Sequence, residues 1–249
     1  MFVKPDNWDT LSPKEKFALR LDAWESTEDI EFESDEAKAN YERRIRRLRN
    51  ALELNGTDRP IANPGVGEYV LRRGGLDGED ILYNHEKVFE PVMAFNREFQ
   101  PDLAINGFVY PGEVFDTLGL QTYIWAGRQL PPASTIQCVE DEYMTADEYD
   151  DFIIDPSGFW LQKYIPRIFT ALEPFQALPD LPRLTEIVDV GGAAVPFGMP
   201  PVREAVQALL DAGEAAMNYV SVLGKTGAAL KAAGFPGMST TFCKAPFDF

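Results

Sequence analysis

His85 is the single histidine of the chain, so a catalytic triad or a histidine-rich metal site would have to include it. It stands in the expected first turn of a helix, where a solvated histidine is the simpler interpretation. Cys138 and Cys243 are far apart and show neither a CxxC pair nor a histidine at ligand spacing. The sequence therefore predicts two reduced thiols, with no disulfide and no self-contained zinc site.

Two glycine motifs resemble parts of phosphate-binding loops. Gly65 and Gly67 match part of a dinucleotide fingerprint, but the third glycine is missing, which favours an ordinary strand-to-helix loop. Residues 224–226 read Gly-Lys-Thr, yet Tyr219 stands where a phosphate-binding loop needs its first glycine. We therefore expect no nucleotide cradle at either place.

Charged clusters occur at residues 140–151, which are acidic, and at residues 42–49, which are rich in arginine. The acidic run lacks the ligand spacing and the central glycine of a calcium loop, so a charged surface helix with its cap explains it better. The arginines alternate with acids and with a helical apolar stripe, which is typical of a solvated helix face rather than of a nucleic-acid site.

The overall composition favours a folded, water-soluble chain. Its 249 residues are 45% hydrophobic, enough for a large core, and its formal net charge is −17. This charge repels nucleic acid and anionic membrane surfaces, so neither is an expected partner. The first residues lack the basic and apolar regions of a signal peptide, and no apolar stretch approaches a membrane span, so we expect a cytoplasmic protein.

Local signals predict several helices. Ser12 and Glu15 form a capping box before a helix over residues 13–25, and Ser34 begins a second helix that ends near residues 55–56. Asn84 is expected to cap a helix over residues 85–99. A further capping box at residues 145–148 opens a short helix over residues 149–154.

Strand signals are fewer, and the C-terminal part is helical in pattern. Residues 60–64 and 102–106 are short, apolar and bounded by breakers, which predicts two strands, the second of them buried and parallel. Residues 184–190 fit a helix or a strand. We expect a loop over the glycine- and proline-rich residues 191–201 and two helices within residues 203–234.

Several motifs, in order along the chain, resemble the uroporphyrinogen decarboxylase superfamily, and in particular its cobalamin-dependent methyltransferases and O-demethylase components. The motifs are RRLRNAL at 46–52, DRP at 58–60, EK at 86–87, FQPD at 99–102, EYM at 142–144, DEY at 147–149, DP at 155–156 and APFDF at 245–249. Each motif alone is weak. Together they occur in the same order as in the family over nearly the whole chain, which makes the set more specific for the family than any single motif.

The resemblance implies an α/β fold, a partial (β/α)₈ TIM barrel that is helix-rich. Residues 1–57 would form an N-terminal helical extension and residues 58–249 an incomplete barrel. Active sites of such barrels lie at the C-terminal ends of the strands. With residues 60–64 as the first strand and 102–106 as the second, the residues expected to face the pocket are Asn63, Glu68, Tyr69, Asn106 and Tyr110.

The same resemblance implies a function only for a longer parent protein. Residues 63–69 lack the family's basic segment and residues 106–110 lack its tetrapyrrole-binding aspartate, so porphyrinogen decarboxylation is the weaker alternative. Corrinoid-linked methyl transfer is the stronger one, with a small-molecule substrate, a corrinoid protein as partner, and zinc bound by a later half of the barrel. The catalytic residues stay unassigned and no metal ligand is expected here. A non-catalytic helical binding module is the third alternative.

Overall fold

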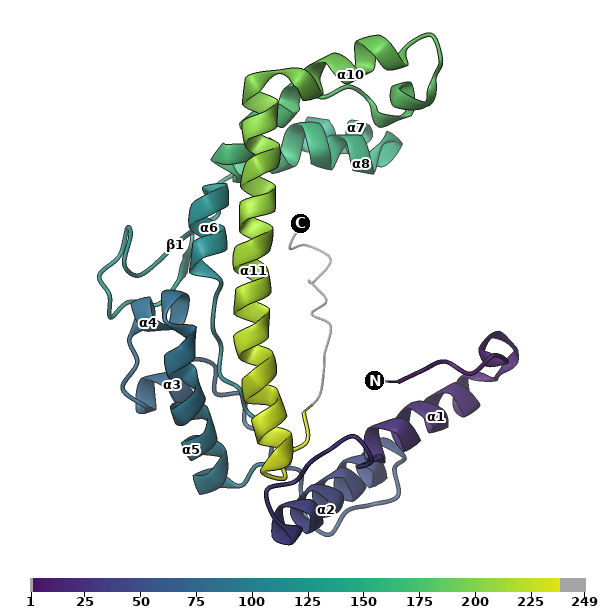
Figure 1. The fold of residues 1–249 in the computed structure, drawn as a ribbon, viewed down its shortest axis with the longest axis vertical. Helices are drawn as coiled ribbons and strands as arrows, with labels where there is room; N and C mark the ends of the chain where they lie inside the picture. The colour runs from purple at the N-terminus through teal and green to yellow at the C-terminus, as the bar shows by residue number, and fades with distance from the viewer. Residues whose placement is uncertain (1, 238–249) are drawn as a thin grey trace. The chain divides into compact units, whose positions relative to one another are not determined.

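The computed structural model describes residues 2–237, drawn as a coloured ribbon in Figure 1. By their contacts, these residues divide into two compact units. Within the described range, unit 1 comprises residues 2–75, 89–108 and 223–237, and unit 2 comprises residues 76–88 and 109–222. The long helix α11 (Pro200–Ala232) contributes residues to both. The boundary predicted at residue 57 differs from this division, because both of its sides belong to unit 1.

Unit 1 begins with a short 3₁₀ turn, η1 (Trp8–Thr10), and two helices that pack together, α1 (Pro13–Glu25) and α2 (Asp35–Leu52). Both helices start as predicted. The Ser12 N–H donates to Glu15 Oε2 at 2.8 Å, and the Ser34 hydroxyl accepts from the Ala37 N–H at 3.1 Å. The buried face of α2 contains Ala37, Tyr41, Ile45 and Leu48.

The prediction of a solvated arginine face on α2 is wrong for two of its residues. Arg44 and Arg47 are 5% and 6% exposed and lie on the buried face. Their apolar stems pack while their guanidinium groups reach partners from other segments. Burial of these charges depends on partners far away in the sequence, which helical periodicity does not report.

Helices α3 (Tyr69–Arg73) and α5 (Phe89–Phe99) lie side by side in unit 1 (Figure 1). Val70 and Leu71 of α3 and Val92 and Phe95 of α5 are buried. The helix predicted over residues 85–99 is therefore a 3₁₀ turn, η2 (His85–Val88), followed by α5. Asn84 does not begin it, because Asn84 is the C-cap of the preceding helix.

The predicted strands over residues 60–64 and 102–106 are not strands in the structure. One backbone hydrogen bond nevertheless joins the two segments, and a second joins the residues that follow them. The Asp102 N–H donates to the Ala62 carbonyl at 2.8 Å, and the Phe108 N–H donates to the Gly67 carbonyl at 3.3 Å. Because both residue numbers rise together, the segments run parallel, with too few regular bonds between them to form a ladder.

Unit 2 is built mainly from short helical segments. They are α4 (Gly78–Tyr83), η2, α6 (Gly112–Leu118), η3 (Ala146–Glu148), α7 (Tyr149–Ile154), α8 (Pro156–Phe159), η4 (Trp160–Tyr164), α9 (Ile165–Ile168), η5 (Thr170–Ala177), η6 (Leu181–Thr185) and α10 (Val190–Gly198). The strands in the described chain are β1 (Tyr123–Ile124) and β2 (Gln137–Cys138), an antiparallel pair in which Tyr123 faces Cys138. The described fold is thus helix-rich, with less strand than an α/β protein usually has.

Unit 2 has two hydrophobic clusters. One joins Leu118, Leu172 and Phe175 to the first half of α11 through Val202 and Ala205. The other contains Leu82, Leu120, Trp125 and Ala126. The predicted capping box before α7 is present, since the Thr145 N–H donates to Glu148 Oε2 at 3.1 Å.

Two predictions for the C-terminal part are wrong. Residues 191–201 are mostly helical, because α10 covers Val190–Gly198, and the two helices predicted within residues 203–234 are the single helix α11. Residues 184–190 contain the end of η6 and the start of α10 and no strand. A glycine inside a helix costs only about 1 kcal/mol, so Gly213 and Gly224 do not interrupt a long alanine-rich helix that has partners along it.

None of the helices in the described part of the chain is both long enough and apolar enough to span a membrane.

Candidate functional site

The structure brings together two of the predicted pocket residues, Asn63 and Asn106. They line one cavity of about 400 Å³ in unit 1, between residues 63–67 and residues 103–108. Both asparagine side chains are exposed to it. The glycine-rich segment and the apolar segment after Asp102 therefore form the two walls of a site.

Asp102 positions these walls. Its side chain is fully buried, and its Oδ2 accepts hydrogen bonds from the Ala62 N–H at 2.7 Å and from Arg59 Nη1 at 2.8 Å. Its Oδ1 accepts from Arg59 Nη2 at 2.8 Å and from Arg47 Nη1. The donors satisfy the oxygens of this buried carboxylate, and the bond to the Ala62 N–H fixes residue 62 one step before Asn63.

Arg47 also forms a two-pronged ion pair with Asp58, at 2.6 and 2.7 Å. Hydrogen bonding by Arg47 lowers the pKa of Asp58 to about 2. The carboxylates of Asp58 and Asp102 share one guanidinium of α2, so the turn over residues 58–62 is attached to the helix by charge-assisted bonds.

Arg44 holds the other side of the site. Its Nε donates to the Pro101 carbonyl at 2.9 Å, its Nη1 to the Gly234 carbonyl at 2.7 Å, and its Nη2 to Gln100 Oε1 at 2.6 Å. The guanidinium lies 4.3 Å from the centre of the Phe235 ring. Burial lowers the pKa of Arg44 to about 10, which leaves it a cation at neutral pH.

Asn96 of α5 was not among the predicted site residues, yet it supports the cavity wall directly. It is fully buried, its Nδ2 donates to the Ile105 carbonyl at 2.7 Å, and its Oδ1 accepts from the Ile105 N–H at 2.9 Å. Its amide group therefore makes the two backbone hydrogen bonds with Ile105 that a neighbouring strand would make in a sheet. The only sequence signal was an asparagine on the apolar face of a helix.

The chemistry of this cavity is that of neutral hydrogen bonding. Its walls contain two amide side chains, glycines, and apolar residues such as Phe108, with no titratable side chain. The amides of Asn63 and Asn106 can each donate and accept, which suits a carbonyl, hydroxyl or amide group of a ligand. General acid–base catalysis would require a group from elsewhere.

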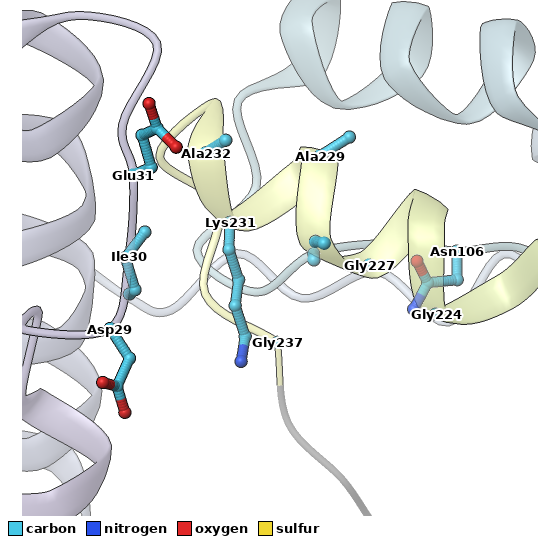
Figure 2. Close-up of a pocket in the computed structure, with 12 residues that line it drawn as sticks. Asp29, Ile30, Glu31, Asn106, Gly224, Gly227, Ala229, Lys231, Ala232 and Gly237 are labelled. Carbon is cyan, nitrogen blue, oxygen red and sulfur yellow. The ribbon is translucent and has the colours of Figure 1, made fainter. Parts of the chain in front are cut away.

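A second cavity of about 660 Å³ shares Asn106 and Ala104 with the first (Figure 2). Asn106 lies near Gly224 of α11, while Asp29 and Glu31 come from the segment between α1 and α2 (Figure 2). A Cβ atom at Gly224 or Gly227 would meet no atom within 4 Å, so this face of α11 is open. Lys231 lies at the end of the cavity near Asp29 (Figure 2).

The other predicted pocket residues lie elsewhere. Glu68 forms an ion pair with Arg72 at 2.9 Å, one helical turn away. Tyr69 is half-exposed, and its ring packs edge-on against Phe95 with centres 6.5 Å apart. Tyr110 belongs to unit 2 and packs against the cluster around Trp125.

His85 is half-buried in unit 2, and not the solvated residue that was predicted. Its Nε2 lies 2.9 Å from the Tyr110 carbonyl, and its ring packs against Tyr219 with centres 5.0 Å apart. Burial raises the pKa of Tyr219, whose hydroxyl donates to the Val109 carbonyl at 3.0 Å.

Within residues 2–237, no group of three or more His, Cys, Asp or Glu side chains is arranged to hold a metal ion.

The acidic run at residues 140–151 is partly neutralised by two ion pairs. Glu148 pairs with Arg167 and Asp151 pairs with Lys163, each at 2.6 Å. Cys138 is an exposed free thiol, and Cys243 lies outside the described residues.

No protein-family model matches this chain, and it has no significant match among curated proteins or solved structures.

Proposed function

We propose that this chain is the front part of a (β/α)₈ barrel protein resembling the uroporphyrinogen decarboxylase superfamily, and that the cavity of Asn63 and Asn106 is part of its substrate pocket. In the full-length protein the reaction is corrinoid-linked methyl transfer on a small molecule. The protein acts in the cytoplasm, with a corrinoid protein as partner. The proposal rests on the ordered motifs and on the geometry around Asp102.

One observation carries the proposal. The two segments taken as the first and second barrel strands are joined by the bond from Asp102 to Ala62, and the residues after them by the bond from Phe108 to Gly67, so the chain runs in parallel on the two sides. Asn63 and Asn106 lie near the C-terminal ends of these segments and line the same cavity. Ligand sites of parallel α/β folds form at the carboxyl ends of neighbouring strands, which is the relation these two residues have.

A third segment supports the same arrangement. The Ala104 N–H donates to the Pro236 carbonyl at 2.8 Å, so the chain after α11 returns to the side of residues 102–106. A helix between two neighbouring extended segments is the connection that parallel strands require. These backbone contacts between residue 102 and residue 62 and between residue 104 and residue 236 support the proposal that the three extended segments are neighbours.

The composition of the cavity favours methyl transfer over porphyrinogen decarboxylation. A substrate with several carboxylates needs cations, and no lysine or arginine is among the residues 2–237 that line this cavity. The nearest arginines are occupied, because Arg47 and Arg59 both donate to Asp102. A neutral ligand with a carbonyl or hydroxyl group suits the two asparagines better.

The zinc and the corrinoid implied by the resemblance would supply methyl activation when bound. The described residues do not fit a zinc site, since no suitable group of ligands is present among them. We therefore assign no catalytic step to residues of this part of the chain. Asn63 and Asn106 are proposed only to bind and orient a substrate.

The experiment compares two reactions of the full-length gene product that contains this sequence. We expect methyl exchange with methylcobalamin and no turnover of uroporphyrinogen. Replacing Asn63 or Asn106 by alanine should raise KM about tenfold, since each removes hydrogen bonds worth about 1 kcal/mol or more. Asn55→Ala, an exposed asparagine outside the cavity, is the matched control.

Turnover of uroporphyrinogen alone would establish the decarboxylase alternative and contradict methyl transfer. A gene product that ends at residue 249, unfolds cooperatively, stays monomeric and binds no apolar dye would instead establish the helical binding module.

A further inference from the structure

A third cavity of unit 1 combines apolar walls with two cations. Its volume of about 580 Å³ lies within the range of small-molecule sites, and it shares no residue with the cavity of Asn63 and Asn106. The cations are Arg20 of α1 and Lys231 of α11, so residues from both ends of the sequence meet here. The apolar walls are formed by Phe2, Val3, Ala23, Trp24 and Ile30.

Neither cation of this cavity has a carboxylate partner. The side chains of Arg20 and Lys231 form no ion pair and no hydrogen bond within residues 2–237, whereas Arg47 and Arg49 of α2 are both bound to carboxylates. The chain has 40 acidic and 23 basic residues, so this pairing is missing although carboxylates are in excess. The cavity therefore presents positive charge to a ligand.

Two further cations lie close to one wall of the cavity. Lys4 Nζ and Lys16 Nζ lie 5.9 and 5.6 Å from the centre of the Trp8 ring, and the Arg20 guanidinium lies 5.1 Å from the same point. The Phe2 ring packs edge-on against Trp8, with centres 5.3 Å apart. Like charges gathered around one ring raise the local positive potential, which attracts an anion to this part of an otherwise acidic chain.

Tyr41 of α2 supplies a buried hydroxyl to the same cavity. The residue is 2% exposed, and its hydroxyl forms no hydrogen bond within the described chain. Among the described residues, no wholly buried side-chain nitrogen or oxygen lacks a partner, so this hydroxyl must reach accessible space, and the cavity is the space that Tyr41 lines. Burial raises the pKa of the Tyr41 phenol, which therefore stays a neutral donor.

The charge balance of the cavity distinguishes between anions. Asp29 is the carboxylate that lines it within the described residues, beside the two cations. Two positive charges and one negative charge leave one positive charge, which suits a monoanion better than a phosphate dianion. Guanidinium, ammonium and phenol groups all donate to carboxylate oxygens, and the apolar walls favour a ligand with an apolar body.

We propose that this cavity binds a small amphiphilic carboxylate, whose anionic head lies among the donors Arg20, Tyr41 and Lys231. Its apolar body packs against Phe2 and Trp24, which removes apolar surface from water on both sides. The site is separate from the cavity of Asn63 and Asn106, and the proposal does not depend on methyl transfer.

The test compares octanoate with 1-octanol, which has the same apolar chain and no charge. Isothermal titration calorimetry on the 249-residue chain should show that octanoate binds at least about tenfold more tightly than octanol. Arg20→Gln and Lys231→Gln should each weaken octanoate about tenfold, the effect of losing one charge-assisted contact, and leave octanol unchanged. Both side chains are exposed, so neither replacement should unfold the chain.

Tyr41→Phe separates a binding role from a structural one. This replacement should weaken octanoate about fivefold, because the donor is lost. It should leave the melting temperature of the ligand-free chain unchanged, because the hydroxyl has no partner among the described residues. A lower melting temperature with unchanged octanoate binding would contradict the assignment of Tyr41 to the site.

Arg46→Gln on α2 and Lys225→Gln on α11 are the matched controls, since each removes an exposed cation that does not line the cavity. They should leave octanoate binding unchanged. No binding of octanoate, equal binding of octanoate and octanol, or a loss in the controls as large as in Arg20→Gln would overturn the proposal. Displacement of octanoate by an equal concentration of inorganic phosphate would also overturn it, because it would indicate a site for a bare anion.

Discussion

The carboxylate of Asp102 connects three parts of unit 1 at the level of single residues. It accepts hydrogen bonds from Arg47 of α2, from Arg59 of the following turn, and from the backbone of Ala62. Burial of an ion pair gains little net stability when both charges are satisfied. Removal of the Asp102 charge is costly, however, because Arg47, Arg59 and the Ala62 N–H lose a charge-assisted acceptor, although Arg47 keeps its ion pair with Asp58.

Asp102→Asn should therefore lower the free energy of unfolding by about 3 kcal/mol, since hydrogen bonds to a charged group contribute about 1.5–3 kcal/mol each and the amide keeps only part of this set. Urea denaturation followed by circular dichroism measures this loss. Asp58→Asn is the matched control, because Asp58 binds the same Arg47 but its side chain is 64% exposed. Equal losses in the two variants would contradict a special role for the buried carboxylate.

At the scale of elements, the end of α11 must approach α2 closely. Gly234 follows this helix with φ +90°, and a Cβ atom there would lie 2.4 Å from the Ala37 carbonyl oxygen of α2. The Gly234 carbonyl also accepts from Arg44. Glycine at this position thus provides both the left-handed backbone conformation and the close contact between backbones.

Gly234→Ala should consequently destabilise the chain by about 3 kcal/mol, through a left-handed alanine that costs about 1–2 kcal/mol and overpacking that costs a similar amount. Gly75→Ala is a suitable comparison. Gly75 has nearly the same φ, +88°, with no atom within 4 Å of a Cβ, so it reports the backbone cost alone. The difference between their urea midpoints measures the contact with α2, and identical midpoints would show that α2 simply moves aside.

At the scale of the whole molecule, both units contain carboxylates whose ionised form is stabilised by arginine. Arg47 lowers the pKa of Asp58 in unit 1 from 3.8 to about 2, and Arg167 lowers the pKa of Glu148 in unit 2 from 4.5 to about 2. A carboxyl group whose pKa is lower in the folded state stabilises the fold fully at pH values above its pKa in the unfolded state. That stabilisation is lost as the pH falls through its pKa in the folded state.

Stability should therefore decline as the pH falls from about 5 to about 2, and Arg167→Gln should remove part of this pH dependence by returning the pKa of Glu148 towards its ordinary value. Urea midpoints measured across this range, with an NMR titration of Glu148, test the expectation. Arg203→Gln, which removes an exposed arginine from α11, should leave the slope unchanged. An Arg167 variant with the original slope would refute the assignment.

The sequence by itself determined the features that depend on neighbours a few residues apart. Three helix starts were predicted correctly from their capping residues, because each cap forms its hydrogen bonds within three residues. They are the starts of α1 (Ser12 and Glu15), of α2 (Ser34) and of the η3–α7 segment (Thr145 and Glu148). Residues 224–226, where Tyr219 replaces the first glycine of a phosphate-binding loop, lie inside α11.

Only the tertiary structure decided the features that depend on distant partners. Arg47 and Asp102 are 55 positions apart, and Arg44 and Gly234 are 190 apart, so no local pattern revealed that two arginines of a charged helix are buried. The same holds for residues 60–64 and 102–106, whose backbone bonds go to side chains such as Asp102 and Asn96 as well as to each other. Buried polar groups must find partners, and the fold determines which ones they find.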